Sequence, residues 1–309
     1  MATHCRICSS SNVGEPFLVR EMMFGLREGF EYIECLSCGC IQILKYPADL
    51  SRFYPPDYYS FNSNVPKPKS SLISRIILYL KYFARLYYRK FNRSYRAPWP
   101  IKLGMYPHHR VLDIGCGNGA RLMEWYNLGA FRLTGIDQFV SEGRTLAPGV
   151  RIIKGDFYDL EERYDLVMMH ETLEHLPNQQ RVFDKVNALL NKGGTFLVRI
   201  PIKSWAWETY GVNWVQLDAP RHFYIHTENS LNLLAQNAGF RVEEVLYDSW
   251  HFQFTGSELY VRDISLMEAR QRSIFSEEEI DEYRKRAKQL NKERKGDQAA
   301  FILKKKVPK

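Results

Sequence analysis

Three glycines at alternate positions, with an acid two residues before the first, form the stretch best suited to hold a ligand. The stretch reads D-x-G-x-G-x-G and runs from Asp113 to Gly119. Glycine lets a backbone turn sharply and approach a ligand without an intervening side chain. A carboxylate at the mouth of such a turn is unfavourable for a pyrophosphate but suits an ammonium group. The same residues also satisfy the permissive G-x-G-x-x-G/A dinucleotide fingerprint, so the turn alone leaves the ligand undecided.

Short apolar runs alternate with helical segments around and beyond this turn. We expect strands at 111–114, 133–136, 150–154, 164–169 and 195–200, and helices at 120–126 and 178–190. This alternation predicts right-handed crossovers and a doubly wound, mostly parallel α/β sheet. Ligands bind beyond the carboxyl ends of the strands in such sheets. Residues with suitable side chains stand at those ends, namely Asp137, Gln138, Asp156, Phe157 and His170.

The motifs VLDIGCGNG, GID, GDFYDL, YDLVMMHETLEHLPN and LLNKGGTFLVRIP resemble, in order and spacing, those of the class I S-adenosylmethionine-dependent methyltransferases. The resemblance implies that Asp113 and the glycine turn hold the methionine part of the cofactor. It also implies that Asp137 holds the ribose and Asp156 the adenine amino group. The cofactor residues implied in this way are Asp113, Gly115, Cys116, Gly117, Gly119, Asp137, Gln138, Asp156, Phe157 and His170.

The rest of the chain fits the same fold class. A helix is expected at 227–237, a strand at 241–247, and a final strand at 298–304 that resembles the family's antiparallel seventh. We therefore expect a Rossmann-like, seven-stranded, mostly parallel sheet whose last strand is antiparallel. The mostly helical stretch at about 256–296 is interpreted as an insertion that covers the sheet or a partner surface.

Two C-x-x-C pairs, Cys5 with Cys8 and Cys35 with Cys38, have the spacing of a zinc ribbon. Thiolates two residues apart on a tight turn converge on one tetrahedral ion, and two such turns complete the site. A disulfide framework is the alternative. The sequence shows no secretory signal peptide, so we expect a reducing cytoplasm and structural Zn²⁺. Cys40 is interpreted as a bystander that could stand in as a ligand.

The 309 residues are predicted to divide into a zinc-ribbon-like module at 1–60, a basic linker at 61–98 and a methyltransferase domain at 99–309. The linker has no acid, and its basic residues account for the formal net charge of +8. Because the positive charge is confined to this segment, a general nucleic-acid-binding surface is not indicated.

The linker contains an amphipathic helix, at about 70–93. Helical steps of about 100° place its cationic residues, such as Lys81 and Arg85, opposite an apolar face. That face consists of Leu72, Ile73, Ile76, Leu80, Phe83, Tyr87 and Phe91. We expect it to pack on the methyltransferase domain. The alternative is peripheral contact with the inner membrane face, which would bring the enzyme to lipid-linked acceptors.

Methyl transfer to a hydroxyl needs a base near the carboxyl ends of the fourth and fifth strands. We prefer His222, in WVQLDAPRHFYIHTENSL, with Tyr224 beside it, and His170 is the second candidate. His175 is expected to be mainly structural. HETLEH is not a zincin helix, because its histidines are five residues apart and H-E-x-x-H needs four.

Two segments, LDAPRHFYIHTENSL and FYPPDYYSF at 53–61, resemble parts of zinc-ribbon-bearing methyltransferases associated with sugars and cell-surface glycans. In related deoxysugar methyltransferases a His and Tyr pair serves as base, although their H-E-H run is absent here. We therefore expect O-methylation of a sugar or glycan hydroxyl. The alternatives are a zinc-ribbon RNA base methyltransferase and a non-catalytic scaffold that binds S-adenosylmethionine.

Overall fold

The computed structural model describes residues 4–54, 64–69, 71–92, 97–270 and 273–306. The tyrosine-rich stretch at 53–61 therefore lies outside the described residues, apart from Phe53 and Tyr54. Contacts divide the chain into two compact units. Unit 1 contains the described residues of Met1–Pro55, Glu171–Asn187 and Val198–Lys306, and unit 2 those of Pro56–His170 and Ala188–Leu197. The linear division at 60 and 98 stays a prediction.

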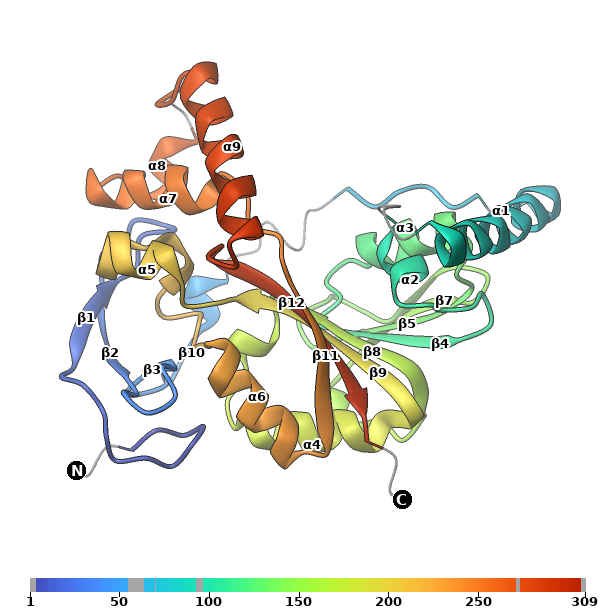
Figure 1. The fold of residues 1–309 in the computed structure, drawn as a ribbon, viewed down its shortest axis with the longest axis horizontal. Coiled ribbons are helices and arrows are strands. Elements are labelled where there is room, and N and C mark those ends of the chain that lie inside the picture. The colour runs from blue at the N-terminus through green and yellow to red at the C-terminus, as the bar shows by residue number, and fades with distance from the viewer. Residues whose placement is uncertain (1–3, 55–63, 70, 93–96, 271–272, 307–309) are drawn as a thin grey trace. The chain divides into compact units, whose positions relative to one another are not determined.

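The larger sheet has the strand order β11-β12-β9-β8-β4-β5-β7-β6 (Figure 1). Its strands are β4 (Arg110–Ile114), β5 (Arg132–Asp137), β6 (Arg144–Ala147), β7 (Val150–Lys154), β8 (Tyr164–His170), β9 (Leu190–Pro201), β11 (Phe240–Tyr247) and β12 (Gln298–Lys305). Strand β4 pairs in parallel with β5 and β8, and β5 pairs in parallel with β7. The last strand, β12, runs antiparallel to β11 as predicted.

The prediction of seven strands is wrong, because the described part of this sheet contains eight. The additional strand is β6, which pairs antiparallel with β7 at the sheet edge. Its four residues, RTLA, are partly exposed and give no apolar run that the sequence could reveal. Strand β9 also begins at Leu190, earlier than the predicted residue 195, because 191–194, between the predicted helix and strand, belong to the strand.

Unit 2 contains the glycine turn and the helices α1 (Leu72–Phe91), α2 (Trp99–Lys102) and α3 (Ala120–Leu128). Helix α3 buries four side chains, among them Leu122 and Trp125. Helix α1 lies beside α3 (Figure 1). It buries Leu78 and Tyr82.

The packing expected for the apolar face of α1 is not found. Leu72, Ile73 and Phe91 are 74%, 73% and 69% exposed, respectively, although the sequence predicts that they face the domain. Leu78 and Tyr82, the two side chains that α1 buries, lie outside the predicted apolar face. The hydrophobic pattern therefore identified the helix correctly but not the side on which it packs.

A glycine permits the close approach of α1 to α3. Gly129 ends α3 with a φ of 115°, a left-handed conformation that favours glycine. A Cβ at this position would lie 2.9 Å from the Leu78 carbonyl oxygen and 3.0 Å from the Tyr82 Cβ. Both the backbone conformation and the contact with α1 therefore depend on this residue.

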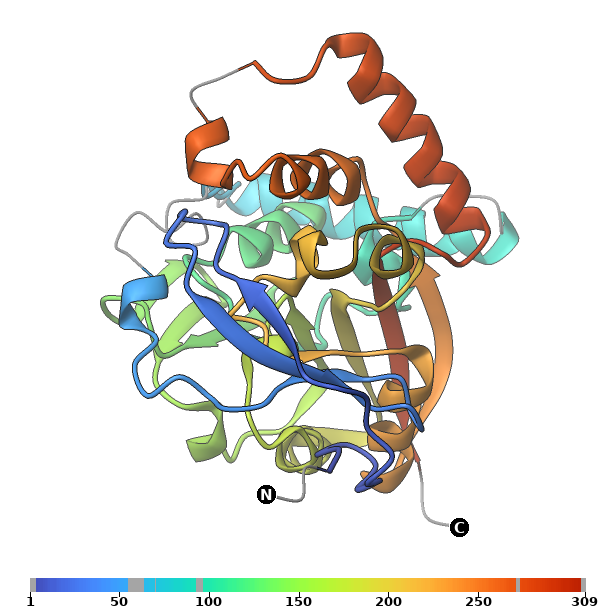
Figure 2. The ribbon, with the colours of Figure 1, turned by 90° about the vertical axis from the view of Figure 1, so that its left-hand side faces the viewer.

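Unit 1 contains a smaller sheet with the strand order β1-β2-β3-β10. Its strands are β1 (Phe17–Arg20), β2 (Gly29–Glu34), β3 (Ile41–Ile43) and β10 (Tyr224–Ile225). Figure 2 shows the β1–β2 ribbon in dark blue. All three pairings are antiparallel. The sheet formed by the cysteine-bearing segment is thus completed by a strand from the loop that carries the predicted base.

The helices of unit 1 are mostly C-terminal. They are α4 (Gln179–Leu189), α5 (Trp205–Tyr210), α6 (Glu228–Asn237), α7 (Phe252–Val261), α8 (Leu266–Ala269) and α9 (Glu277–Lys292). The last three form the predicted helical insertion. Helix α9 packs on α7 through a small core of Phe254, Ala287 and Leu290. Capping boxes at Ser265 and Ser276 fix the starts of α8 and α9.

Replacement of Gly129 by alanine should lower the free energy of unfolding by about 1–2 kcal/mol for the left-handed backbone alone. Displacement of α1 adds to this loss. Gly104→Ala is the matched control, since Gly104 has a φ of 67° and a Cβ there would meet no described atom within 4 Å. Urea unfolding should show the larger loss for Gly129→Ala. Equal losses would mean that α1 does not depend on the close contact.

Candidate functional site

The glycine turn of unit 2 has the backbone that its sequence predicts. Gly115, Gly117 and Gly119 have positive φ angles of 75°, 52° and 84°. At Gly119 a Cβ would lie 2.6 Å from Leu146 and 2.8 Å from Ile152. Strand β6, which the sequence did not reveal, therefore supports the turn from behind.

Asp137 ties the end of β5 to this turn. Its Oδ2 accepts a hydrogen bond from the Gly117 backbone N–H at 2.9 Å, and its Oδ1 accepts one from Phe139 N–H at 2.8 Å. Asp113 lies in β4 and is 3% exposed. Burial raises the pKa of the Asp113 carboxyl to about 7, although the Arg121 charge acts to lower it, and the Asp137 charge adds to the rise. A cationic ligand group would stabilise the charged form of Asp113.

The remaining predicted cofactor residues also lie in unit 2. Asp156 follows β7 and accepts a hydrogen bond from the Tyr158 backbone N–H at 2.9 Å, and Phe157 beside it is buried. His170 ends β8 and is buried, Cys116 lies within the turn, and Gln138 is exposed. The predicted ligand positions thus follow the carboxyl ends of β4, β5, β7 and β8, as a ligand at this edge of the sheet requires.

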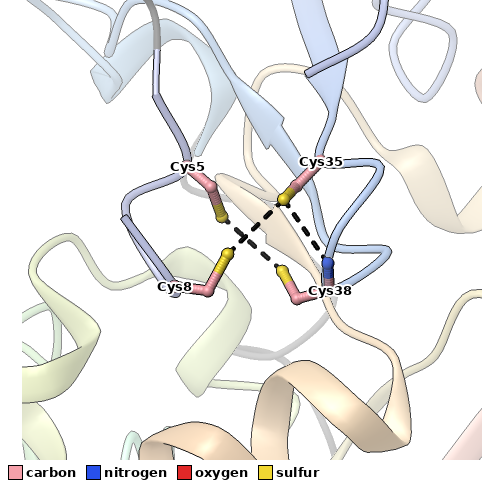
Figure 3. Close-up of side chains that lie close together, drawn as sticks. All are labelled: Cys5, Cys8, Cys35 and Cys38. Atoms are coloured by element: carbon pink, nitrogen blue, oxygen red, sulfur yellow. Dashed lines mark hydrogen bonds between the residues drawn. The ribbon is translucent and has the colours of Figure 1, made fainter. Parts of the chain in front are cut away.

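The four predicted metal ligands of unit 1 lie together (Figure 3). The Cys5 and Cys38 sulfurs are 3.6 Å apart, and the Cys8 and Cys35 sulfurs are 3.5 Å apart. None of the four forms a disulfide. Tetrahedral Zn²⁺ with Zn–S bonds of about 2.3 Å would place the sulfurs about 3.8 Å apart. The four thiols therefore fit a closed zinc site, and Cys40 is not part of the group.

A second group of polar side chains in unit 1 contains the predicted base. His222 is buried, and its Nδ1 lies 2.7 Å from the Gln216 carbonyl oxygen. The His175 Nδ1 lies 2.9 Å from the Arg221 carbonyl oxygen and 3.1 Å from the Tyr54 hydroxyl oxygen. The two imidazole rings are 4.7 Å apart between centroids. The His222 Nε2 lies 4.0 Å from the Glu174 Oε1.

The hydrogen bonds define the tautomers of both histidines. A carbonyl oxygen can only accept, so each Nδ1 carries the hydrogen and each Nε2 has a lone pair. Burial lowers the pKa of His175 to about 3 and lowers the pKa of His222 as well. Burial raises the pKa of Glu174 well above its usual value. Both imidazoles are therefore neutral at pH 7, and His222 Nε2 can accept a proton.

A buried ion pair fixes the loop that carries His222. Arg221 is fully buried, and its Nη2 lies 2.5 Å from Asp218 Oδ1 and 3.1 Å from Glu21 Oε1. Burial alone would raise the pKa of Asp218, but the Arg221 guanidinium lowers it to about 2. Glu21 also accepts backbone hydrogen bonds from Met23 and Leu26. The ion pair thus joins the β1–β2 turn to the loop before β10.

Sequence reasoning missed Glu21, Asp218 and Glu174. Glu174 lies inside the motif YDLVMMHETLEHLPN. Asp218 lies inside LDAPRHFYIHTENSL, four residues before His222. Glu21 gives no local signal, because its partner is far away in the sequence. Tyr224 lies in β10, where its hydroxyl is 2.5 Å from the Tyr46 hydroxyl. The structure therefore places Tyr224 against Tyr46, and its predicted catalytic role stays a prediction.

Comparison with known proteins identifies the class of this chain. The family described as "Methyltransferase domain" matches residues 63–245, which is more than half of the sequence. The chain belongs to this family. It is an enzyme of the S-adenosylmethionine-dependent methyltransferase class, and its Rossmann-like α/β fold is that of the class.

Individual relatives differ in the reactions that their names state. The chain is 25% identical over 187 residues to a ubiquinone biosynthesis O-methyltransferase of Rhodopseudomonas palustris. This alignment covers 53% of this chain and 71% of that protein. It is 25% identical over 201 residues to a sterol 24-C-methyltransferase of Saccharomyces cerevisiae, covering 53% and 49%, respectively. The chain thus spans about half of the second relative.

Structural comparison also aligns the chain with magnesium protoporphyrin IX methyltransferase from Synechocystis PCC 6803 with bound SAH. It is 12% identical, covers 83% of this chain and 95% of that chain, and has a TM-score of 0.45.

Replacement of Arg221 by leucine should lower the free energy of unfolding by about 3–5 kcal/mol, because it leaves buried carboxylates without their counter-charge. Arg284→Leu is the control, since Arg284 pairs with Asp281 on the exposed side of α9 and should contribute at most about 1 kcal/mol. Urea unfolding of both variants measures the difference. Similar losses would contradict a special role for the buried pair.

Proposed function

We propose that this enzyme transfers the methyl group of S-adenosylmethionine to a hydroxyl of a sugar or glycan. The observation that carries the choice of a hydroxyl is the His222 imidazole, which is neutral, buried and held with its Nε2 lone pair available. A hydroxyl acceptor must lose a proton during transfer, and a neutral imidazole is a suitable acceptor for it. The resemblance of 217–231 to segments of glycan-modifying methyltransferases supports the choice of a sugar.

The cofactor is proposed to bind at the glycine turn of unit 2. The turn brings backbone N–H groups close to the ligand, and the Asp113 carboxylate would attract the ammonium group of the methionine part. Asp137 is proposed to bind the ribose, and Asp156 and Phe157 the adenine. Transfer then needs the acceptor oxygen in line with the methyl group, with water excluded.

Three side chains are proposed to assist the acceptor. His222 accepts the hydroxyl proton, with Asp218 Oδ2 at 3.8 Å from its Nε2 to stabilise the resulting imidazolium. His170, at the end of β8, and Tyr224 are the other candidates. The O-methyltransferase named among the relatives supports oxygen as the acceptor atom, but other relatives act on carbon. The RNA base alternative has no supporting observation in the part of the chain that the structure describes.

We further infer that Cys5, Cys8, Cys35 and Cys38 hold a structural Zn²⁺. The sulfur separations support this inference, as do the backbone N–H groups of Ile7 and Cys38, which point at the sulfurs of Cys5 and Cys35. When bound, the ion would link the first cysteine turn to the second across β1 and β2. Four thiolates complete a tetrahedral shell, so this ion would have no open position for a substrate.

Localisation is proposed to be cytoplasmic, with contact to the inner membrane face through α1. Among the described residues, no helix combines the length and apolarity needed to cross a bilayer. The exposed apolar residues of α1, among them Leu72, Ile76 and Leu80, support the surface contact, as do Lys81 and Lys90 on the same helix. Such a contact would suit a lipid-linked glycan as acceptor.

Cofactor affinity should depend on the charge of Asp113. The carboxylate form binds the ammonium group, so affinity should fall several-fold as the pH drops from about 7.5 to about 6, through the Asp113 pKa of about 7. Above about pH 8 affinity should fall again, because the α-amino group of the ligand loses its own proton. Calorimetric titration with S-adenosylmethionine and its demethylated product measures this. Asp113→Asn should bind more weakly and lose the fall in affinity on the acid side. An unchanged affinity in the variant would place the cofactor elsewhere.

Turnover should depend on His222. His222→Gln should lower turnover by about 100-fold or more while cofactor affinity stays within about twofold, because the lost group acts on the acceptor. Transfer of labelled methyl to nucleotide-sugars and lipid-linked glycans is the assay. His108→Ala removes an exposed histidine and serves as the control. Near-normal turnover in His222→Gln would mean that another group accepts the hydroxyl proton.

A further inference from the structure

We propose that Glu174, His175 and His222 form a second metal site, which binds a divalent cation such as Zn²⁺ and is separate from the four cysteines. One ring nitrogen of each histidine and one carboxylate oxygen of Glu174 all lie within 4.8 Å of one another. The metal-binding part of this proposal stands without the proposed function. Its consequence for the acceptor rests on that function.

The Nε2 atoms of both histidines and the carboxylate oxygens of Glu174 are all hydrogen-bond acceptors. Both Nδ1 atoms carry their hydrogens toward carbonyl oxygens, of Gln216 and Arg221, so both Nε2 lone pairs remain. The third group is a carboxylate. Three converging acceptors repel one another unless a cation or a proton lies among them. A metal-binding histidine characteristically donates its other N–H to a carbonyl or carboxylate, and both histidines here do so.

Glu174 gives the second, independent observation. Its side chain is fully buried, and neither carboxylate oxygen has a hydrogen-bond partner within the described ranges of the chain. A buried carboxylate without a partner is costly for a fold to keep. The neighbouring charges increase this cost, because Glu171 and Asp218 are negative and only Arg199 opposes them. A divalent cation would supply the missing partner and the missing positive charge.

Two imidazoles and one carboxylate are a ligand set suited to Zn²⁺ with an open position, or to Fe²⁺. Metal–ligand bonds of about 2.1 Å would place the ligand atoms about 3.4 Å apart. The His222 Nε2 and Glu174 Oε1 are 4.0 Å apart, so a small side-chain rotation would suffice. Three protein ligands leave a position at which a hydroxyl oxygen could bind. In that form His222 Nε2 would be a ligand and not the base. The cation would lower the pKa of a bound hydroxyl, and the released proton would pass to solvent water.

Zinc stoichiometry tests the proposal without cofactor or acceptor, so its failure is separate from failure of methyl transfer. The full chain is dialysed to equilibrium against Zn²⁺, and bound metal is measured by elemental analysis. Wild type should bind about two equivalents, one at the cysteines and one at the new site. Glu174→Gln and His222→Gln should each bind one. Cys38→Ser should keep the equivalent at Glu174, His175 and His222, and His108→Ala should keep both.

A second measurement uses only the wild type, in case a variant fails to fold. Titration with Co²⁺ should give one equivalent with thiolate-to-metal absorption and a further equivalent with only the weak visible bands of nitrogen and oxygen ligands. Two equivalents retained by folded His222→Gln would overturn the proposal. So would wild type that binds only the thiolate-ligated equivalent.

Discussion

The buried guanidinium of Arg221 is the constraint on which unit 1 depends. It binds Asp218 within its own loop and Glu21 in the β1–β2 turn, so one side chain holds two segments that are distant in the sequence. Its backbone carbonyl also accepts a hydrogen bond from His175. Since Asp218 lies 3.8 Å from His222, the same interaction sets the surroundings of both histidines. A guanidinium buried in this way is tolerated because carboxylates hydrogen-bond to it directly.

The small sheet shows why the cysteine segment and the acceptor loop belong to one structural unit. Strand β10 adds Tyr224 and Ile225 to a sheet that otherwise comes from 17–43. Thr227, the N-cap of α6, donates its hydroxyl hydrogen to the Cys38 carbonyl at 2.6 Å. An ion at the cysteines would therefore stabilise more than a separate N-terminal module. It would also hold the end of the loop that carries His222.

Local pattern explains which features the sequence could reveal. Some features depend only on residues within a few positions of one another, namely the glycine turn, the two C-x-x-C pairs and the parallel strands β4, β5, β7 and β8. The bounds of these four strands were predicted to within one residue. The pairing of Arg221 with Glu21 joins residues far apart in the chain, so no local sequence pattern predicts it. Strand β6 is too short and too polar to be predicted from hydrophobic pattern. The apolar face of α1 could be predicted from its sequence. The sequence does not show that Gly129 lets the opposite face of α1, with Leu78 and Tyr82, pack closely against the end of α3.

Buried carboxylates mark the proposed binding sites in both units. Asp113 is 3% exposed with a pKa raised by burial, and Glu174 is fully buried with no hydrogen-bond partner for its carboxylate in the described structure. Asp218 lies against Arg221, which keeps it charged. Asp218 therefore has a structural role, whereas Asp113 and Glu174 are proposed to bind ligands. A structural carboxylate carries its own counter-charge within the fold, whereas a carboxylate whose burial the protein compensates only in part is stabilised when a cationic ligand or metal ion arrives.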